Sequence, residues 1–486
     1  MQKIEIYKTQ MRYTRFLFLL TIVAVLSMAF ISCKKDDIKP VNAPTHELLD
    51  DYVKTIEAVS VISDEIYTLD EVMSQVMNSG MFNDAGPMAS QITNMIKSQM
   101  RDTLASWNRR FNLNASDVRV RCVKYTYRTI DHKGNPITLS SYATWAFPNI
   151  SNPQSATIHN RLILFCPYSQ TKEDFRATAT CGGPASAMLT KDALIVSPDP
   201  QGFGHDSGHD QMYMNHELIG IQMADAMTAA YKIFMDAGFR LAGDFILTPM
   251  GMSQGAATSV ATQRYLENTS LTLSSETRSL ADWWQMGYTF VSSGPYSPEI
   301  TMNEYLTWQT CAHPGVIPLV LKTMIQSYPQ IYDGYTEDDF YSENYLAHKH
   351  FFDSVYLYKP YTIDEINALM FELISTPEHQ VSNPNTMVLT DMISSALLDP
   401  ASPLHQKMHQ SLQRNDLTTG WTPRHNIYIT ASEMDDYVPF ANAEALQQMS
   451  HNKVHLLTVE QGDHQATCLF WLLKAFTGAY DSQLER

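Results

Sequence analysis

The sequence predicts an α/β protein whose core is a mostly parallel β-sheet with helices on both faces. Short, continuously apolar runs alternate with stretches of helical periodicity, the pattern of strands that are buried on both faces and joined by crossover helices. The runs cover 161–166, 193–197, 244–248, 288–291, 426–430 and 454–459. Before them, period-two alternation over 118–127 and 137–147, around a polar turn at 131–136, predicts an antiparallel hairpin.

The composition agrees with a folded domain and argues against nucleic acid as a partner. Of the 486 residues, 44% are hydrophobic and 17% are charged, which allows a large buried core. The formal net charge is -17. An acidic surface repels phosphate backbones, so a small molecule is a more suitable partner than nucleic acid. Length, composition and net charge do not determine the oligomeric state.

The first 50 residues have the pattern of an export signal. Four basic residues precede an uncharged, mostly apolar run at 16–31, which is short for a membrane span. The run ends in Ser32-Cys33, which resembles a bacterial lipobox, and the charged residues at 34–37 resemble the tether of Bacteroidetes-type surface lipoproteins. We therefore expect a signal peptide at 1–32, lipidation of Cys33 and a tether at 33–50, giving an outer-membrane lipoprotein on the periplasmic or outer side. An uncleaved anchor helix is the alternative.

The remaining chain divides into a core and two helical parts. Apolar residues at three- and four-residue steps predict an N-terminal helical segment at 51–112. The α/β core occupies 113–297 and 421–486, and a largely helical insertion at 298–420 separates its two parts. The insertion is either a cap over the active site or a helical subdomain with its aromatic residues inside. These residues are Tyr328, Tyr332, Tyr335, Phe340, Tyr341, Tyr345, Phe351, Phe352, Tyr356, Tyr358 and Tyr361.

The segment from Gly251 to Gly255 has the Gly-x-Ser-x-Gly pattern of a nucleophile elbow around Ser253. In such an elbow the serine occupies a sharp turn between a strand and a helix, and the glycines leave room for the neighbouring backbone. An apolar run precedes this pattern, and the small residues Ala256 and Ala257 follow it. A tight turn without catalytic function is the alternative.

An acid and a histidine follow in the order that this chemistry requires. Asp435 comes after the run at 426–430 and begins an Asp-x-x-Val-Pro pattern, and His464 comes after the last run, at 454–459. An aspartate at this place fixes the tautomer of the histidine and stabilises its charged form. Asp436 is the alternative acid, and either aspartate suits a turn or a helix N-cap. A loop histidine without function remains the alternative for His464.

Stabilising an oxyanion needs two backbone N–H groups. Gln254, directly after the nucleophile, supplies one. The other is expected from the loop after the run at 161–166, where Pro167 has no N–H group, so Tyr168 or Ser169 must donate. We favour Tyr168.

These features together resemble the α/β-hydrolase superfamily, and more narrowly its secreted esterases and lipases. The matching pieces are the hairpin, the Pro-Asp-containing segment at 197–204, the elbow, Asp435 and His464. The resemblance implies an eight-stranded, mostly parallel sheet flanked by helices, a Ser-His-Asp triad and no cofactor. Two features depart from the family: Pro167-Tyr168 replaces the usual His-Gly of the oxyanion loop, and Ala256 replaces a glycine often found after the elbow.

A polar segment after the run at 193–197 contains His205, Asp206, His209, Asp210 and, further on, His216. It is a solvated loop, the rim of a substrate pocket or a metal site, and we expect no bound metal. The function that fits best is hydrolysis of small to medium uncharged carboxylic esters, with the aromatic insertion narrowing access. A serine peptidase of the same fold and an inactive, surface-tethered glycan-binding protein are the alternatives.

Overall fold

The computed structural model describes residues 47–56, 59–77, 118–148, 158–167, 171–179, 192–383, 386–460 and 462–477. The chain divides into Met1–Pro44 and Thr45–Arg486, and every described residue belongs to the second part. The predictions for Cys33 and Tyr168 therefore lie outside the described residues. Within the described ranges, no helix has the length and apolar character needed to cross a membrane.

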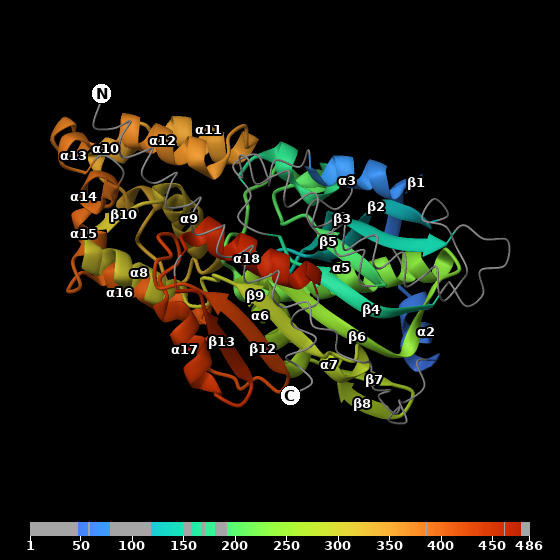
Figure 1. The fold of residues 1–486 in the computed structure, drawn as a ribbon. Coiled ribbons are helices and arrows are strands. Elements are labelled where there is room, and N and C mark those ends of the chain that lie inside the picture. The colour runs from blue at the N-terminus through green and yellow to red at the C-terminus, as the bar shows by residue number, and fades with distance from the viewer. Residues whose placement is uncertain are drawn as a thin grey trace. The chain divides into compact units, whose positions relative to one another are not determined.

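A nine-stranded sheet forms the centre of the described part of the chain (Figure 1). Its order is β1-β2-β3-β5-β4-β6-β9-β12-β13, and all neighbours from β5 to β13 pair in parallel. The strands are β1 (Val59–Tyr67), β2 (Val118–Ile130), β3 (Pro136–Pro148), β4 (Ile158–Phe165), β5 (Ala193–Pro198), β6 (Arg240–Met252), β9 (Tyr288–Ser292), β12 (Asn426–Ala431) and β13 (Val454–Thr458). The predicted fold class, the hairpin and the six later strands are confirmed, although β13 is largely exposed or half-buried instead of buried on both faces. β1 makes the described sheet one strand larger than expected.

β1 corrects part of the predicted helical segment at 51–112. The chain forms α2 (Glu47–Lys54), then β1, which pairs antiparallel with β2, and then α3 (Leu69–Met77). The apolar spacing was misleading because these side chains do not form a buried stripe: Val61, Ile62 and Ile66 are 53%, 51% and 58% exposed. β-Branched residues are well suited to such an edge strand. Residues 78–112 are outside the described ranges.

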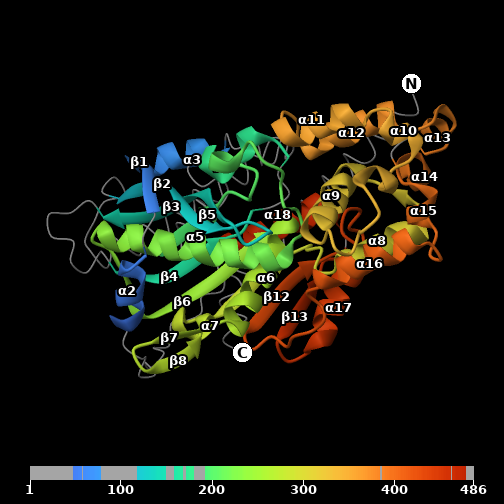
Figure 2. The ribbon, with the colours of Figure 1, turned by 180° about the vertical axis from the view of Figure 1, so that it is seen from behind.

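Helices cover both faces of the sheet, as Figures 1 and 2 show from opposite sides. Successive strand residues point to opposite faces. Leu164 of β4 belongs to the apolar cluster that includes α5 (His216–Asp236), whereas the ring of the next residue, Phe165, lies 6.3 Å from Trp471 of α18 (His464–Thr477). The other described elements of the core are α6 (Gln254–Asn268), α7 (Leu280–Trp283), α17 (Ala441–Met449) and a small hairpin of β7 (Ser270–Leu273) and β8 (Glu276–Ser279).

The insertion at 298–420, called the cap below, is a helical subdomain with its own apolar core. Seven of its eleven aromatic residues named above are buried in it, and Tyr358 is 74% exposed. The aromatic residues therefore mainly hold the cap together instead of offering a stacking surface. Its described elements are α8 (Pro298–Trp308), β10 (Thr310–Cys311), α9 (Ile317–Ser327), α10 (Glu343–Leu346), α11 (Lys349–Tyr358), α12 (Ile363–Leu373), α13 (Pro377–Ser382), β11 (Met387–Val388), α14 (Leu389–Met392), α15 (Ser395–Leu398) and α16 (Pro403–Arg414).

The cap is attached to loops that follow the carboxyl ends of β5 and β12. Lys322 pairs with Asp210 at 2.8 Å, after β5. The buried ammonium group of Lys359 donates to the carbonyl oxygens of Ser207 and His209, at 3.3 and 3.2 Å. After β12, the hydroxyl of Tyr305 donates to the Tyr437 carbonyl at 2.8 Å. The cap therefore lies at the edge of the sheet where substrates bind in open α/β folds.

The described cysteines include both free thiols and a disulfide-bonded residue. Cys166, Cys311 and Cys468 are free and buried. Cys122, in β2, is disulfide-bonded to a partner outside the described residues.

Candidate active site

Ser253 occupies a strained turn between β6 and α6. Its backbone has φ 55° and ψ -129°, a left-handed conformation that costs a non-glycine residue about 1–3 kcal/mol. The Ser253 N–H group donates to the Ser292 carbonyl of β9 at 2.9 Å, which fixes the turn to the neighbouring strand. The side chain is only partly buried and remains accessible. A strained, accessible serine in this position is the geometry of a nucleophile elbow.

The two glycines of the elbow are sterically required. A Cβ atom on Gly251 would lie 2.2 Å from the Gly255 carbonyl oxygen, and one on Gly255 would lie 2.6 Å from the Cys166 carbonyl oxygen at the end of β4. Both distances are far below van der Waals contact. The glycines therefore allow the start of α6 to pack directly against the ends of two strands.

Asp435 and His464 form a buried pair beyond the ends of β12 and β13. The carboxylate oxygens of Asp435 lie 3.0 and 2.9 Å from Nδ1 of His464. The N–H groups of Tyr437 and Val438 donate to Oδ1 of Asp435 at 2.9 and 2.8 Å and hold the carboxylate in place. Because Nδ1 faces a carboxylate, it carries the proton, and Nε2 is left as the basic atom of the neutral ring.

Asp435 also controls the ionisation of His464. Burial by itself lowers the pKa of the imidazole, but the charge of Asp435 and its hydrogen bond outweigh burial and raise the pKa well above 6.5. The arrangement therefore stabilises the imidazolium ion, as required of a histidine that accepts a proton during a reaction.

Asp436, the alternative acid, has a different set of contacts. Its Oδ1 accepts the backbone N–H group of His464 at 3.4 Å, and its Oδ2 lies 3.6 Å from Nε2 of His313, a residue of the cap. Burial raises the pKa of Asp436, but its contacts with His313 and the His464 N–H group prevail and lower it to about 2. Of the two aspartates, Asp435 therefore has the geometry to orient the imidazole.

Ser253, Asp435 and His464 follow β6, β12 and β13, so all three lie at the carboxyl edge of the parallel strands. In the described part of the chain, the His464 ring bonds to Asp435, and its Nε2 lies 3.9 Å from Sγ of Cys468. No hydrogen bond joins Ser253 to His464 there. Catalytic hydrogen bonds are often long without substrate and tighten in the complex.

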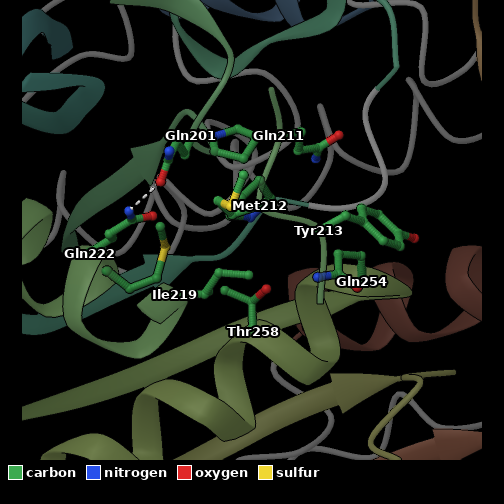
Figure 3. Close-up of a pocket in the computed structure, with 11 residues that line it drawn as sticks. Gln201, Gln211, Met212, Tyr213, Ile219, Gln222, Gln254 and Thr258 are labelled. Carbon is green, nitrogen blue, oxygen red and sulfur yellow. Dashed lines mark hydrogen bonds between the residues drawn. The ribbon is translucent and has the colours of Figure 1, made fainter. Parts of the chain in front are cut away.

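A small cavity borders the elbow on the side of α5 (Figure 3). Its volume is about 20 Å³, roughly the space of one water molecule. Gln254 and Thr258 of α6 line it together with Pro167 and residues of α5 and the loops after β5. Figure 3 shows one amide pair on its wall, in which Gln222 donates to Gln201 at 2.9 Å.

Gln254, the expected first oxyanion donor, lies at the start of α6. It is the first residue of α6, so its N–H group has no partner within the helix and lies at the positive end of the helix dipole. Tyr168, the expected second donor, lies outside the described residues. Pro167, which precedes it, packs against the elbow, because a Cβ on Gly255 would lie 3.0 Å from the Pro167 carbonyl oxygen.

The Pro-Asp segment is structural. Asp199 is fully buried, and its carboxylate accepts hydrogen bonds from the Ser140 hydroxyl, at 2.7 Å, and from Thr178. A Cβ on Gly204 would lie 2.3 Å from the same carboxylate. The segment thus joins the β2–β3 hairpin to the loop after β5.

The polar segment that follows contacts the cap. Asp206 accepts a hydrogen bond from Gly202 and lies 2.7 Å from Nδ1 of His209, while Asp210 pairs with Lys322. Nδ1 of the buried His216 bonds to the Asn415 carbonyl instead. Among the described residues, no group of three or more histidine, cysteine, aspartate and glutamate side chains is placed to hold a metal ion.

No motif in the sequence indicates that His313, Tyr437 or Cys468 is a neighbour of His464. The rings of His313 and Tyr437 stack with centroids 3.8 Å apart, and those of Tyr437 and His464 lie 5.0 Å apart. His313 belongs to the insertion and precedes His464 by more than a hundred residues, so no local sequence pattern links these two residues. Cys468 is one helical turn after His464, and this spacing was the only available signal.

No family model matches the chain, and a search of curated proteins finds no match either. Solved structures do resemble it. The rice cell wall degrading esterase LipA from Xanthomonas oryzae is 18% identical, with a TM-score of 0.59 over 88% of this chain and 97% of that one. A putative hydrolase from Legionella pneumophila is 16% identical, with a TM-score of 0.56 over 76% and 90% of the two chains. At this identity the likeness establishes the α/β-hydrolase fold.

Proposed function

We propose that the protein is a serine hydrolase that cleaves carboxylic esters through Ser253, His464 and Asp435. The observation that carries the proposal is the buried Asp435–His464 pair, at 2.9 Å, beyond the same sheet edge as a strained and accessible serine. A serine with a positive φ and a buried histidine–carboxylate pair with a shifted pKa are both typical of catalytic sites.

The reaction follows from these positions. His464 Nε2 accepts the Ser253 hydroxyl proton while Oγ attacks the ester carbonyl, and Asp435 stabilises the resulting imidazolium. The Gln254 N–H group and a second N–H donor from the loop after β4 stabilise the oxyanion. Tyr168 is our candidate for the second donor. His464 then gives its proton to the departing alcohol. Water, activated by the same nitrogen, attacks the acyl-enzyme and releases the acid and free Ser253.

Small, uncharged esters are the proposed substrates. The cavity beside Gln254 holds about one water molecule, so the described residues leave little room for a long acyl chain there. The cap aromatics are mostly buried in the core of the cap, so few of them are left to stack on a large ligand. The name of the Xanthomonas protein, a cell wall degrading esterase, supports an ester over a peptide bond. Short-acyl glycerides and acetyl or aryl esters of glycans are candidates.

The test is kinetic. The purified chain from residue 45 onward should hydrolyse p-nitrophenyl acetate and butyrate, and Ser253→Ala should reduce this activity to background. A kcat/KM for a lysine or proline anilide tenfold or more above that for p-nitrophenyl acetate would favour a peptidase. Activity on neither class by a folded protein would favour the glycan-binding alternative.

We further propose that Cys33 carries a lipid anchor and that the enzyme is an outer-membrane lipoprotein, on the basis of the lipobox-like sequence before Cys33 and the basic and apolar pattern before it. Globomycin should cause the unprocessed precursor to accumulate. A Cys33→Ala protein that still fractionates with membranes would contradict the anchor, without affecting the proposal for the reaction.

A further inference from the structure

His464 is connected to the cap through Asp436. His464 begins α18, and its backbone N–H group, which has no partner within the helix, donates to Oδ1 of Asp436 at 3.4 Å. A carboxylate at this position is also favoured by the helix dipole. The other oxygen of Asp436 lies 3.6 Å from Nε2 of His313, in the cap.

The Asn367 amide fixes the orientation of the His313 ring from the side opposite Asp436. The Gly315 N–H group donates to Oδ1 of Asn367 at 2.8 Å, so the Asn367 amide must present its NH₂ group to Nδ1 of His313, 3.2 Å away. With Nδ1 accepting, the proton of the neutral ring is on Nε2, facing Asp436. Cap residues thus place the N–H group of His313 on the side of this carboxylate, at a separation of 3.6 Å that is longer than a hydrogen bond.

A second connection runs through Tyr437. One side of its ring stacks on His313 at 3.8 Å with an interplanar angle of 19°, and the ring of His464 lies 5.0 Å away at 34°. The Tyr437 carbonyl accepts the hydroxyl of Tyr305 from α8, and its N–H group donates to Asp435. The residue next to Asp436 therefore contacts the cap, the proposed acid and the proposed base.

We propose that His313 and Asp436 are positioning residues, which hold His464 in its reactive orientation only while the cap is docked. This inference depends on the proposed function. Asp436 and Tyr437 belong to the core, and His313 contacts both of them from the cap, so undocking the cap removes the contacts that position them while leaving Asp435 bonded to His464. The cap is then a part of the active site, coupling closure over a substrate to alignment of the imidazole.

Steady-state kinetics on p-nitrophenyl acetate test the proposal. Asp436→Asn removes the charge but keeps an acceptor for the His464 N–H group, whereas Asp436→Ala removes both. We expect kcat to fall by about tenfold in Asp436→Asn and further in Asp436→Ala, with KM changed by less than about twofold. His313→Phe keeps a ring on Tyr437 and loses the contact of Nε2 with Asp436, and His313→Ala loses both, so the alanine variant should again be the slower one.

The decisive comparison is the double variant His313→Phe/Asp436→Asn. Because the two residues act as one unit, its kcat should lie within about twofold of the slower single variant. His379→Gln is the matched control, since His379 pairs with Asp391 inside the cap at 2.8 Å, and it should retain wild-type kcat. Melting temperatures confirm that each variant is folded.

Wild-type kcat in folded Asp436→Asn and His313→Phe would overturn the inference and leave the esterase proposal intact. Additive losses in the double variant, or an equal loss in His379→Gln, would also overturn it. A folded wild-type chain that cleaves no ester would instead refute the proposed function, and this inference with it.

Discussion

Both carboxylate oxygens of Asp435 face Nδ1 of His464, at 3.0 and 2.9 Å, in a buried contact between the loop after β12 and the start of α18. The neighbouring Asp436 contacts His464 through the backbone N–H group and not through the ring. Adjacent carboxylates therefore support the same histidine in two different ways, one through the ring and the other through the main chain.

Asp435→Asn should abolish most activity while Asp436→Asn retains much more. An asparagine at 435 leaves the packing intact but does not stabilise the imidazolium, and in comparable triads the loss in kcat is about 10⁴-fold. Initial rates on p-nitrophenyl acetate provide the measurement. If Asp436→Asn were the more damaging substitution, the assignment of the acid would be wrong.

The activity should rise with pH as His464 loses its proton. The reaction needs the neutral imidazole, and Asp435 raises the pKa of His464 well above 6.5. The acid limb of kcat/KM should therefore have its midpoint above pH 6.5 and move to lower pH in Asp435→Asn.

Protein stability should show the opposite dependence. The folded pKa of His464 is above its unfolded value, so this stabilisation is complete below about pH 6.5 and is lost as the pH rises through the folded pKa. Urea denaturation of wild type and His464→Gln across this range measures the effect. A difference in stability that does not change with pH would contradict it.

Gly255→Ala should disrupt the elbow. The new Cβ would lie 2.6 Å from the Cys166 carbonyl oxygen, so the start of α6 must move away from β4, and displacements of this size cost about 100-fold in rate. Gly208→Ala is the control, because nothing lies within 4 Å of its Cβ position and its φ is not positive. Equal rates for the two variants would exclude a steric role for Gly255.

Lys359→Met should weaken the attachment of the cap. The buried ammonium group donates to three carbonyl oxygens, of Ser207, His209 and Leu357, and lies 5.2 Å from the centre of the Phe203 ring. Leaving these acceptors unpaired should lower the free energy of unfolding by about 1–3 kcal/mol, measured in urea. Lys232→Met, which removes a surface pair with Asp236, should cost less than about 1 kcal/mol. A loss at Lys359 no larger than this control would argue against its role.

The strands were predictable where burial leaves a continuous signal. Runs such as 193–197 and 288–291 are apolar because both of their faces are covered, and both are strands in the structure. β1 was missed because its apolar residues are exposed and happen to repeat at helical spacing. At an exposed edge, pairing with β2 decides the structure, and no local pattern encodes that pairing.

The site could be predicted only in part, for a similar reason. The elbow is local, since Gly251 and Gly255 act on their immediate neighbours, and Asp435 and His464 each follow a recognisable strand. His313 depends instead on how the cap docks, a long-range property that the sequence does not state. The cap aromatics were ambiguous because a tyrosine in an apolar core and one in a binding surface have the same spacing.

Covalent labelling with a fluorophosphonate tests the central claim most directly. The reagent reacts with a serine only when a base and an oxyanion hole activate it, so it reports the whole arrangement and needs no knowledge of the natural substrate. We predict a single adduct, mapped by peptide mass spectrometry to Ser253, with labelling lost in Ser253→Ala and strongly slowed in His464→Gln. A folded protein that remains unlabelled, or that is labelled at another residue, would contradict the account.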